Sequence, residues 1–384
     1  MKLIPQIVAA AEDLTAIRRD IHAHPEIGFQ EHRTSALVAD LLTRWGIEVT
    51  RGIGGTGVVG VLDGSRPGKT IGLRADMDAL PMEERTNLPY ASKNPGVFHG
   101  CGHDGHTATL LGAAQYLAQS RDFAGRAVFI FQPAEEVLGG ARAMLADGLF
   151  ERFPCDELYG LHNSPLLSPG QMVVNAGPSM AGACMFDIHI NGKGGHGAHP
   201  DKAKDPIVIG AALVSELQSI VSRNMPAVSA AVVSVTRFES GSAYNVIPET
   251  AWLAGTTRYF NEADGDKITA RMKQICAGLA LAHDVEIVAD IRKTFSVLEN
   301  DAQRVADLME VAREVLGEAA SDQGKPSMGS EDMADLLQVV PGAYFKLGIS
   351  GDVPVHNSAY VFDDAMIPVG ATLFARLVET RGAA

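Results

Sequence analysis

The run HGCGHDGH, residues 99–106, places groups that bind metal ions or move protons within one short glycine-rich stretch. Cys101 and His103 carry a thiol and an imidazole, which are common ligands of zinc and related metals. A single cysteine is more often a small buried side chain, and a single histidine is more often structural than a ligand. The run therefore predicts a metal site only if the fold brings further ligands to it.

The further candidates all lie at or just after the end of a segment that is predicted as a strand. They are Glu135 and Glu136 after 127–133, His162 at the end of 157–163, and His356 after 343–349. In a parallel α/β sheet the carboxyl ends of the strands meet at one rim, and ligands bind there. The sequence thus directs one thiol, three imidazoles and two carboxylates toward the same place.

This set of donors favours a site for two metal ions. Catalytic zinc sites usually have three protein ligands, and the candidates exceed that number, as in sites that hold two ions roughly 3.5–4 Å apart. Within the pair Glu135–Glu136, one carboxylate can bind metal while the other accepts a proton from water. The pair alone is equally compatible with the solvated start of a helix, so the prediction depends on the convergence of all the ligands.

The elements that must position these residues alternate between strand and helix patterns. Strands are predicted at 58–62, 70–76, 127–133 and 157–163, and helices at 6–23, 30–45, 107–119 and 139–150. The alternation returns near the end of the chain, with helices at 301–317, 330–338 and 364–380 and a strand at 343–349. It predicts an α/β fold, a layered catalytic domain with a mainly parallel mixed sheet.

Residues 184–295 follow a different pattern. Strands at 184–190, 230–238, 250–260 and 285–291 and helices at 206–223 and 265–282 occur in the order β-α-β-β-α-β, the ferredoxin-like arrangement. We therefore expect a metal-dependent catalytic domain formed by 1–183 and 296–384, with a ferredoxin-like α+β domain inserted between them. The edge strand of such a sheet often pairs with another subunit, so the insert is expected to be a lid or dimerisation domain.

Four polar residues outside the predicted ligand set are weaker candidates. His196, in the loop GKGGHGAHP, is either a solvent-exposed residue or a histidine that stabilises an oxyanion. Asn245 and Arg258 lie in or next to strands, and Arg258 can grip a substrate carboxylate through two hydrogen bonds, although both also suit the surface of a sheet. Asp78, which follows the strand 70–76, either caps a turn or orients a ligand imidazole.

The composition and the sequence pattern argue against a nucleic-acid partner, a membrane helix, a signal peptide and a disulfide framework. The chain of 384 residues has a formal net charge of −14 and no basic run, so no nucleic-acid partner is expected. No apolar stretch of about 18 residues predicts a membrane helix, and the start MKLIPQIVAAAEDL is not typical of a signal peptide. The four cysteines are widely spaced, which argues against a disulfide framework. We therefore expect a cytoplasmic enzyme with a small-molecule substrate.

Motifs from about residue 14 to residue 375 resemble one family. They are IHAHPEIGFQE (21–31), LRADMDALPMEE (73–84), HGCGHDGHTA (99–108), FQPAEE (131–136), LHN (161–163), GGHGAHP (194–200), NVIP (245–248), GSED (329–332) and HN (356–357). The family is that of the co-catalytic metal amidohydrolases related to aminoacylase and glutamate carboxypeptidase. The most similar branch comprises the hippurate hydrolases, N-acyl-L-amino-acid amidohydrolases and auxin-conjugate hydrolases.

The resemblance implies a role for most of the candidate residues. It makes Glu135 the general base, His196 a residue that reaches the active site of the partner subunit, and Asn245 a neighbour of the substrate. The metal ligands that it implies are Cys101, His103, Glu136, His162 and His356. A bridging role of Cys101 between the two ions is a further hypothesis.

The implied activity is hydrolysis of N-acyl-L-amino acids, as in hippurate hydrolases, with two divalent ions of manganese, zinc, nickel or cobalt. The alternatives within the family are deacetylation of N-acetyl-diaminopimelate and a dipeptidase or carboxypeptidase activity. An alternative of another class is a metal- or ligand-binding protein without catalysis. The expected assembly is a homodimer or homotetramer formed through the inserted domain.

Overall fold

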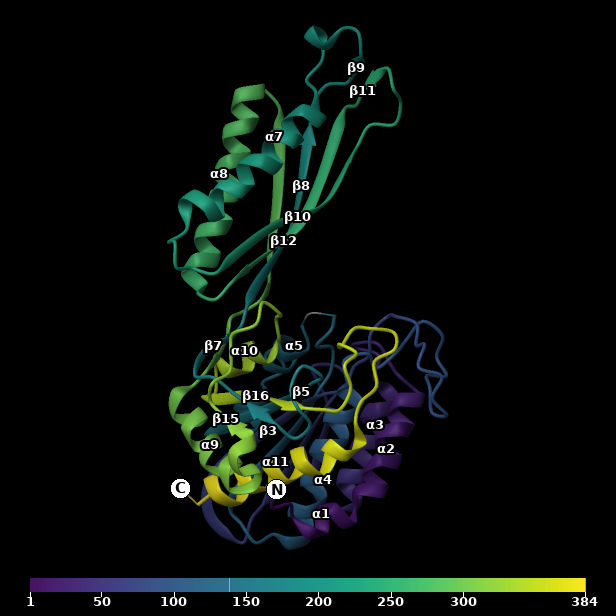
Figure 1. The fold of residues 1–384 in the computed structure, drawn as a ribbon, viewed down its shortest axis with the longest axis vertical. Coiled ribbons are helices and arrows are strands. Elements are labelled where there is room, and N and C mark those ends of the chain that lie inside the picture. Colours follow the sequence, from purple (N-terminus) through teal and green to yellow (C-terminus); the bar gives the residue numbers. More distant parts are fainter. Residues whose placement is uncertain (138, 384) are drawn as a thin grey trace. The chain divides into compact units, whose positions relative to one another are not determined.

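The computed structural model describes residues 1–137 and 139–383, which form two compact units. The larger unit contains Met1–Ser179, Glu299–Lys325 and the chain from Asp332 onward. The smaller unit contains Met180–Leu298 and the short segment Pro326–Glu331. Figure 1 shows the course of the chain through both units.

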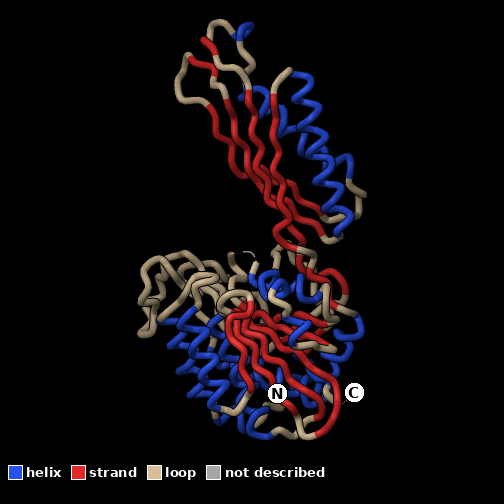
Figure 2. The backbone as a smooth tube through the Cα atoms, turned by 180° about the vertical axis from the view of Figure 1, so that it is seen from behind, coloured by secondary structure: helices blue, strands red, loops and turns tan. Residues whose placement is uncertain are grey.

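An eight-stranded mixed sheet forms the centre of the larger unit (Figure 2). Its strands in spatial order are β1 (Glu48–Ile53), β2 (Gly57–Asp63), β4 (Ala124–Gln132), β3 (Arg66–Asp76), β5 (Glu157–Ser164), β16 (Gly342–Gly348), β6 (Met172–Val173) and β15 (Ala320–Ser321). The central strands β4, β3, β5 and β16 are parallel to one another, whereas β1 and β2 are antiparallel to their neighbours. The predicted α/β fold class is confirmed.

Helices cover this sheet and supply most of the apolar core. They are α1 (Pro5–Ala9), α2 (Ala11–Ala23), α3 (His32–Arg44), α4 (His103–Ser120), α5 (Gly140–Ala146), α6 (Leu149–Arg152), α9 (Ala302–Leu316), α10 (Met333–Leu337) and α11 (Ile367–Arg381). The central strands are buried over most of their length because both of their faces are covered, as the fully buried Leu73, Phe129 and Tyr159 show. Helix α4 packs against α2 and α11, so its apolar residues are buried nearly all round.

The smaller unit is a four-stranded antiparallel sheet with two helices along one face (Figures 1 and 2). The strands in spatial order are β10 (Ala231–Ser240), β12 (Thr250–Tyr259), β8 (Gly182–Asn191) and β13 (Glu286–Phe295), and the helices are α7 (Pro206–Ser219) and α8 (Glu262–His283). Strand β8 alternates buried and exposed residues, as expected for a sheet with one wet face. Both the chain order and the spatial order are those of the ferredoxin-like arrangement.

The start of α4 differs from the prediction in a way that matters for the site. The predicted helix 107–119 begins instead at His103, so His103 lies in the first helical turn and not in the loop before it. Gly102 precedes it with a φ of 89°, a left-handed conformation that glycine adopts without strain and that turns the chain into the helix. Asp104 in the first turn is favourable at the positive end of the helix dipole.

Candidate metal centre

The candidate site lies where the parallel strands of the larger unit end. Strands β3 and β4 run in register to Asp76 and Gln132, and β5 runs parallel beside β3. His162 lies near the end of β5 itself, His103 lies in the first turn of α4, and Cys101 and His356 lie in loops. Glu135 and Glu136 lie in a turn beyond the end of β4.

The structure brings all five predicted ligands into two overlapping groups. One group contains Cys101, His103 and His162, and the other contains Cys101, Glu136 and His356. Within each group, one potential ligand atom of every residue lies within 4.8 Å of the others. Cys101 belongs to both groups, which is the position that a thiolate shared between two ions would need.

The rings of His162 and His103 are oriented by hydrogen bonds at Nδ1, the ring nitrogen that is not directed at the other ligands. Nδ1 of His162 lies 2.6 Å from the backbone oxygen of Asn163, while its Nε2 lies 3.3 Å from Sγ of Cys101. Nδ1 of His103 lies 3.3 Å from Oδ1 of Asp78. A ligand histidine is usually held in this way, because the second nitrogen fixes the ring and leaves Nε2 for the metal.

One buried atom of this cluster is well placed for a metal ion. Among the described residues, Nε2 of His103 has no hydrogen-bond partner. It lies 3.9 Å from Oε1 of Glu136, which forms an ion pair of 3.2 Å with Nε2 of His356. Buried polar atoms are rarely left without partners. The mixed set of sulfur, nitrogen and oxygen donors suits divalent transition metals.

Burial sets the direction of the pKa shift at His162 and Cys101, whereas at His103 burial is outweighed by nearby groups, Asp76 foremost, which raise the pKa. Burial, together with the neighbouring His106, holds the pKa of His162 well below its usual range, so this ring is neutral and can donate a lone pair. Burial also raises the pKa of the Cys101 thiol. A metal ion would therefore displace a proton from Cys101 when it binds, because the ligand is the thiolate.

Asp78 holds the glutamate pair in place. Its Oδ1 accepts a hydrogen bond of 3.1 Å from the backbone N–H of Glu135, and its Oδ2 accepts one of 2.9 Å from that of Glu136. Because the same carboxylate also lies against His103, it links a ligand from α4 to both glutamates. The Glu135 side chain is buried and lies within the group of His103 and Glu136.

His106 and Asn163 support the site, although they were not among the predicted site residues. Nδ1 of His106 lies 2.6 Å from Oδ1 of Asp76, and its Nε2 accepts a hydrogen bond of 3.1 Å from the Asn163 backbone. Both ring nitrogens are thus engaged. The Asn163 side chain donates to the Cys101 oxygen at 2.6 Å and accepts from the Tyr360 hydroxyl at 2.7 Å. The adjacency of Asn163 to His162 was the only signal of this role in the sequence.

The remaining predicted residues lie in the smaller unit. His196 is exposed in the short strand β9 (Gly195–His196), which pairs with β11 (Val246–Ile247). This pairing brings Asn245 close to His196, since the N–H of Gly197 donates to the Asn245 oxygen at 2.8 Å. Arg258 lies outside this two-stranded sheet in β12, where its guanidinium donates to the oxygen of Thr257 at 2.8 Å.

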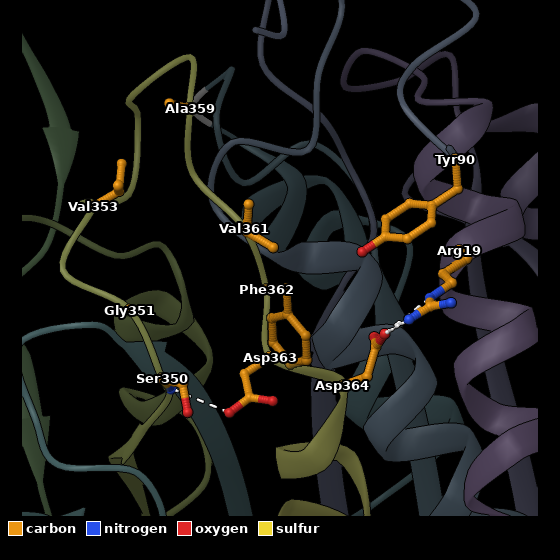
Figure 3. Close-up of a pocket in the computed structure, with 10 residues that line it drawn as sticks. All are labelled: Arg19, Tyr90, Ser350, Gly351, Val353, Ala359, Val361, Phe362, Asp363 and Asp364. Atoms are coloured by element: carbon orange, nitrogen blue, oxygen red, sulfur yellow. Dashed lines mark hydrogen bonds and ion pairs between the residues drawn. The ribbon is translucent and has the colours of Figure 1, made fainter. Parts of the chain in front are cut away.

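A cavity of about 500 Å³ borders segment 350–364, which also carries His356 (Figure 3). On its other side, the Arg19 guanidinium lies 4.5 Å from the centre of the Tyr90 ring and 2.9 Å from a carboxylate oxygen of Asp364. The ion pair between Arg19 and Asp364 anchors the end of segment 350–364, which carries His356. The cavity is not part of the metal cluster.

The replacement Asp78→Asn is expected to weaken metal binding about 10–100-fold, because an amide cannot accept from both backbone N–H groups and from His103 at once. Titration calorimetry with Zn²⁺ or Mn²⁺ would measure the change. Asp122→Asn, at a largely exposed aspartate, is the matched control and should bind as the unchanged protein does. Equal affinities for the Asp78 variant and this control would contradict the orienting role.

Comparison with known proteins agrees with this geometry. The profile of the family described as "Peptidase family M20/M25/M40" matches residues 72–380. The chain is 44% identical to the hippurate hydrolase of Campylobacter jejuni over 98% of both chains, and 37% identical to the N-acetylcysteine deacetylase of Bacillus subtilis over 95% of both. Among solved structures, the YXEP protein of Bacillus subtilis, described as a dinuclear metal binding peptidase, superposes with a TM-score of 0.84 at 34% identity, over 96% of this chain and 98% of that one. The chain belongs to the peptidase family M20/M25/M40.

Proposed function

We propose that this protein is a metal-dependent amidohydrolase that cleaves the amide bond of N-acyl-L-amino acids, as hippurate hydrolases do. The products are a carboxylic acid and a free amino acid. The observation that carries the proposal is the position of Glu135, a buried carboxylate held against two overlapping groups of metal ligands. The identity of 44% to a hippurate hydrolase supports this substrate class.

Two divalent ions, of manganese, zinc, nickel or cobalt, would be held by the five clustered residues. The proposed ligands are Cys101, His103, Glu136, His162 and His356. When bound, such ions polarise the scissile carbonyl and lower the pKa of water toward about 7.

The protein's own contribution is the placement and movement of protons. Glu135 accepts a proton from the attacking water and later delivers it to the leaving nitrogen, since one carboxylate can act first as base and then as acid. Asp78 keeps this carboxylate in position by accepting a hydrogen bond from the backbone N–H of Glu135. In this proposal, His196 of a neighbouring subunit stabilises the oxyanion, while Asn245 and Arg258 bind the substrate, with Arg258 on its carboxylate.

The proposal includes the assembly and the location of the protein. The inserted domain, residues 184–295, acts as a lid and forms the contact between the subunits of a homodimer or homotetramer. The protein acts in the cytoplasm on small molecules. Among the described residues, none of the helices combines the length and the apolar character needed to cross a bilayer.

The test is a panel of substrates with the metal-free protein and added Mn²⁺, Zn²⁺, Co²⁺ or Ni²⁺. Hippurate and other N-acyl amino acids should be hydrolysed only after a metal is restored. Preferential cleavage of N-acetyl-diaminopimelate or of an unblocked dipeptide would favour the deacetylase or the dipeptidase alternative. Metal binding without hydrolysis of any of these compounds would favour a binding protein and contradict the proposal.

A further inference from the structure

The turn between β4 and α5 brings both carboxylates of the glutamate pair to the same imidazole. Potential ligand atoms of Glu135, Glu136 and His103 all lie within 4.8 Å of one another. Successive residues of an extended strand point to opposite sides, so the chain must leave the strand conformation just before this pair. It does so at Ala134, whose φ of 56° is left-handed.

Ala134 is an unusual residue for this conformation. Glycine adopts a positive φ without strain, whereas a residue with a β-carbon keeps it only where the surrounding structure enforces it. Ala134 is fully buried, and a β-carbon added to Gly28 would lie 2.9 Å from Cα of Ala134. The segment around Gly28 therefore packs directly against the turn.

Two buried carboxylates hold the backbone of this turn. The N–H of Ala134 donates to Oε1 of Glu31 at 2.8 Å. The next two N–H groups, those of Glu135 and Glu136, donate to the two oxygens of Asp78 at 3.1 Å and 2.9 Å. Three successive N–H groups are thus bound by acidic side chains that lie far away in the sequence.

Glu31 is itself fixed from other sides. Its second carboxylate oxygen, Oε2, accepts a hydrogen bond from the hydroxyl of Thr56, which directly precedes β2. Its backbone oxygen accepts a hydrogen bond of 2.8 Å from the N–H of Ser35 in α3. The carboxylate is therefore anchored to the start of β2 and to α3, and it presents one oxygen to the turn.

We propose that Glu31 is a positioning residue for the general base. By holding the N–H of Ala134 it maintains the left-handed turn, and the turn places the Glu135 carboxylate beside His103. This inference rests on the proposed amidohydrolase function and adds to it a residue that acts through another. Asp78 binds only the N–H groups that follow the turn, so it does not replace this contact.

The experiment measures kcat, KM and metal content for the metal-loaded protein with the N-acyl amino acid that it cleaves fastest. Glu31→Ala should lower kcat by about 10²-fold, the size of effect that a small misplacement of a catalytic group produces. KM and metal content should stay nearly unchanged, because the contact acts on the step of proton transfer.

Glu31→Gln should keep most of the activity. Its amide oxygen can accept from the N–H of Ala134, and its amide nitrogen can donate to the hydroxyl oxygen of Thr56. Asp156→Ala is the matched control, since the Asp156 carboxylate also accepts a hydrogen bond of 2.8 Å from a distant backbone N–H, that of Thr70. This control should keep its kcat.

Two further variants separate positioning from a loss of stability. Glu31→Met keeps the volume of the side chain but has no oxygen, so it guards against a misfolded alanine variant and should show the same fall in kcat. Glycine adopts the left-handed φ unaided, so adding Ala134→Gly to Glu31→Ala should restore kcat by about tenfold.

A purely structural Glu31 would give variants that unfold at a lower temperature, with kcat per folded chain unchanged and no rescue by Ala134→Gly. That result, or an equal loss of kcat in Glu31→Gln and Glu31→Ala, would overturn the inference while leaving the amidohydrolase intact. If the unchanged protein hydrolyses no N-acyl amino acid with any metal, the proposed function itself fails, and this inference fails with it.

Discussion

Glu135→Gln is expected to lower kcat for the best N-acyl amino acid by about 10³-fold while leaving the metal content of the protein unchanged. The amide has nearly the size of the carboxylate, so the turn after β4 keeps its backbone bonds to Asp78. It cannot accept a proton from water, however, which removes the step that we propose for this position. Steady-state kinetics and elemental analysis on the same samples measure both quantities.

The neighbouring glutamate provides the comparison. Glu136→Gln changes the adjacent residue by the same atoms, but Glu136 belongs to the ligand group with Cys101 and His356. This variant should lose bound metal, and its activity should recover in part when the metal concentration is raised. Turnover of Glu135→Gln within tenfold of the unchanged protein would contradict the assignment of the base, as would a metal loss equal to that of Glu136→Gln.

The convergence of these residues could be predicted because the strands that position them are buried on both faces. Long apolar runs predicted β4 and β5 close to their observed limits, Ala124–Gln132 and Glu157–Ser164. Once parallel strands are assigned, the rule that their carboxyl ends share one rim needs no information about distant contacts. The rule brings together the donors at the ends of β4, β5 and β16, whereas Cys101, in the loop before α4, does not lie at a strand end.

The start of α4 could not be predicted in the same way. Hydrophobic periodicity assigns helices from their apolar face, but the first turn of α4 buries His103, Asp104 and His106. His106 and His103 pair with Asp76, the last residue of β3, and with Asp78 just after it. Asp104 pairs with Arg18 and His22 of α2. Such pairing between distant polar groups leaves no periodic pattern. The edge strand β1 was missed for a related reason, because its mostly exposed residues form no apolar run.

Cys101→Ser is expected to reduce the metal content from two ions per chain to one or fewer and to abolish most of the hydrolysis. The reason is that, of the residues that the structure describes, Cys101 alone is common to the ligand group that contains His162 and the one that contains His356. A serine hydroxyl keeps the shape of the side chain but stays protonated near neutral pH, so it is a poor replacement for a thiolate that serves two ions. Elemental analysis after removal of excess metal measures the stoichiometry.

Cys155→Ser is the matched control, because this half-buried thiol donates to the oxygen of Phe153 and, within the described part of the chain, belongs to none of the ligand groups. A second measurement uses pH. Burial raises the pKa of Cys101, and the metal requires the thiolate, so loading of the unchanged protein should strengthen as pH rises toward that pKa. The Cys101 variant should lose this part of the pH dependence and the control should keep it. A Cys101→Ser protein that still binds two ions would show that each ion has its own separate ligands, and the shared-thiolate arrangement would have to be abandoned.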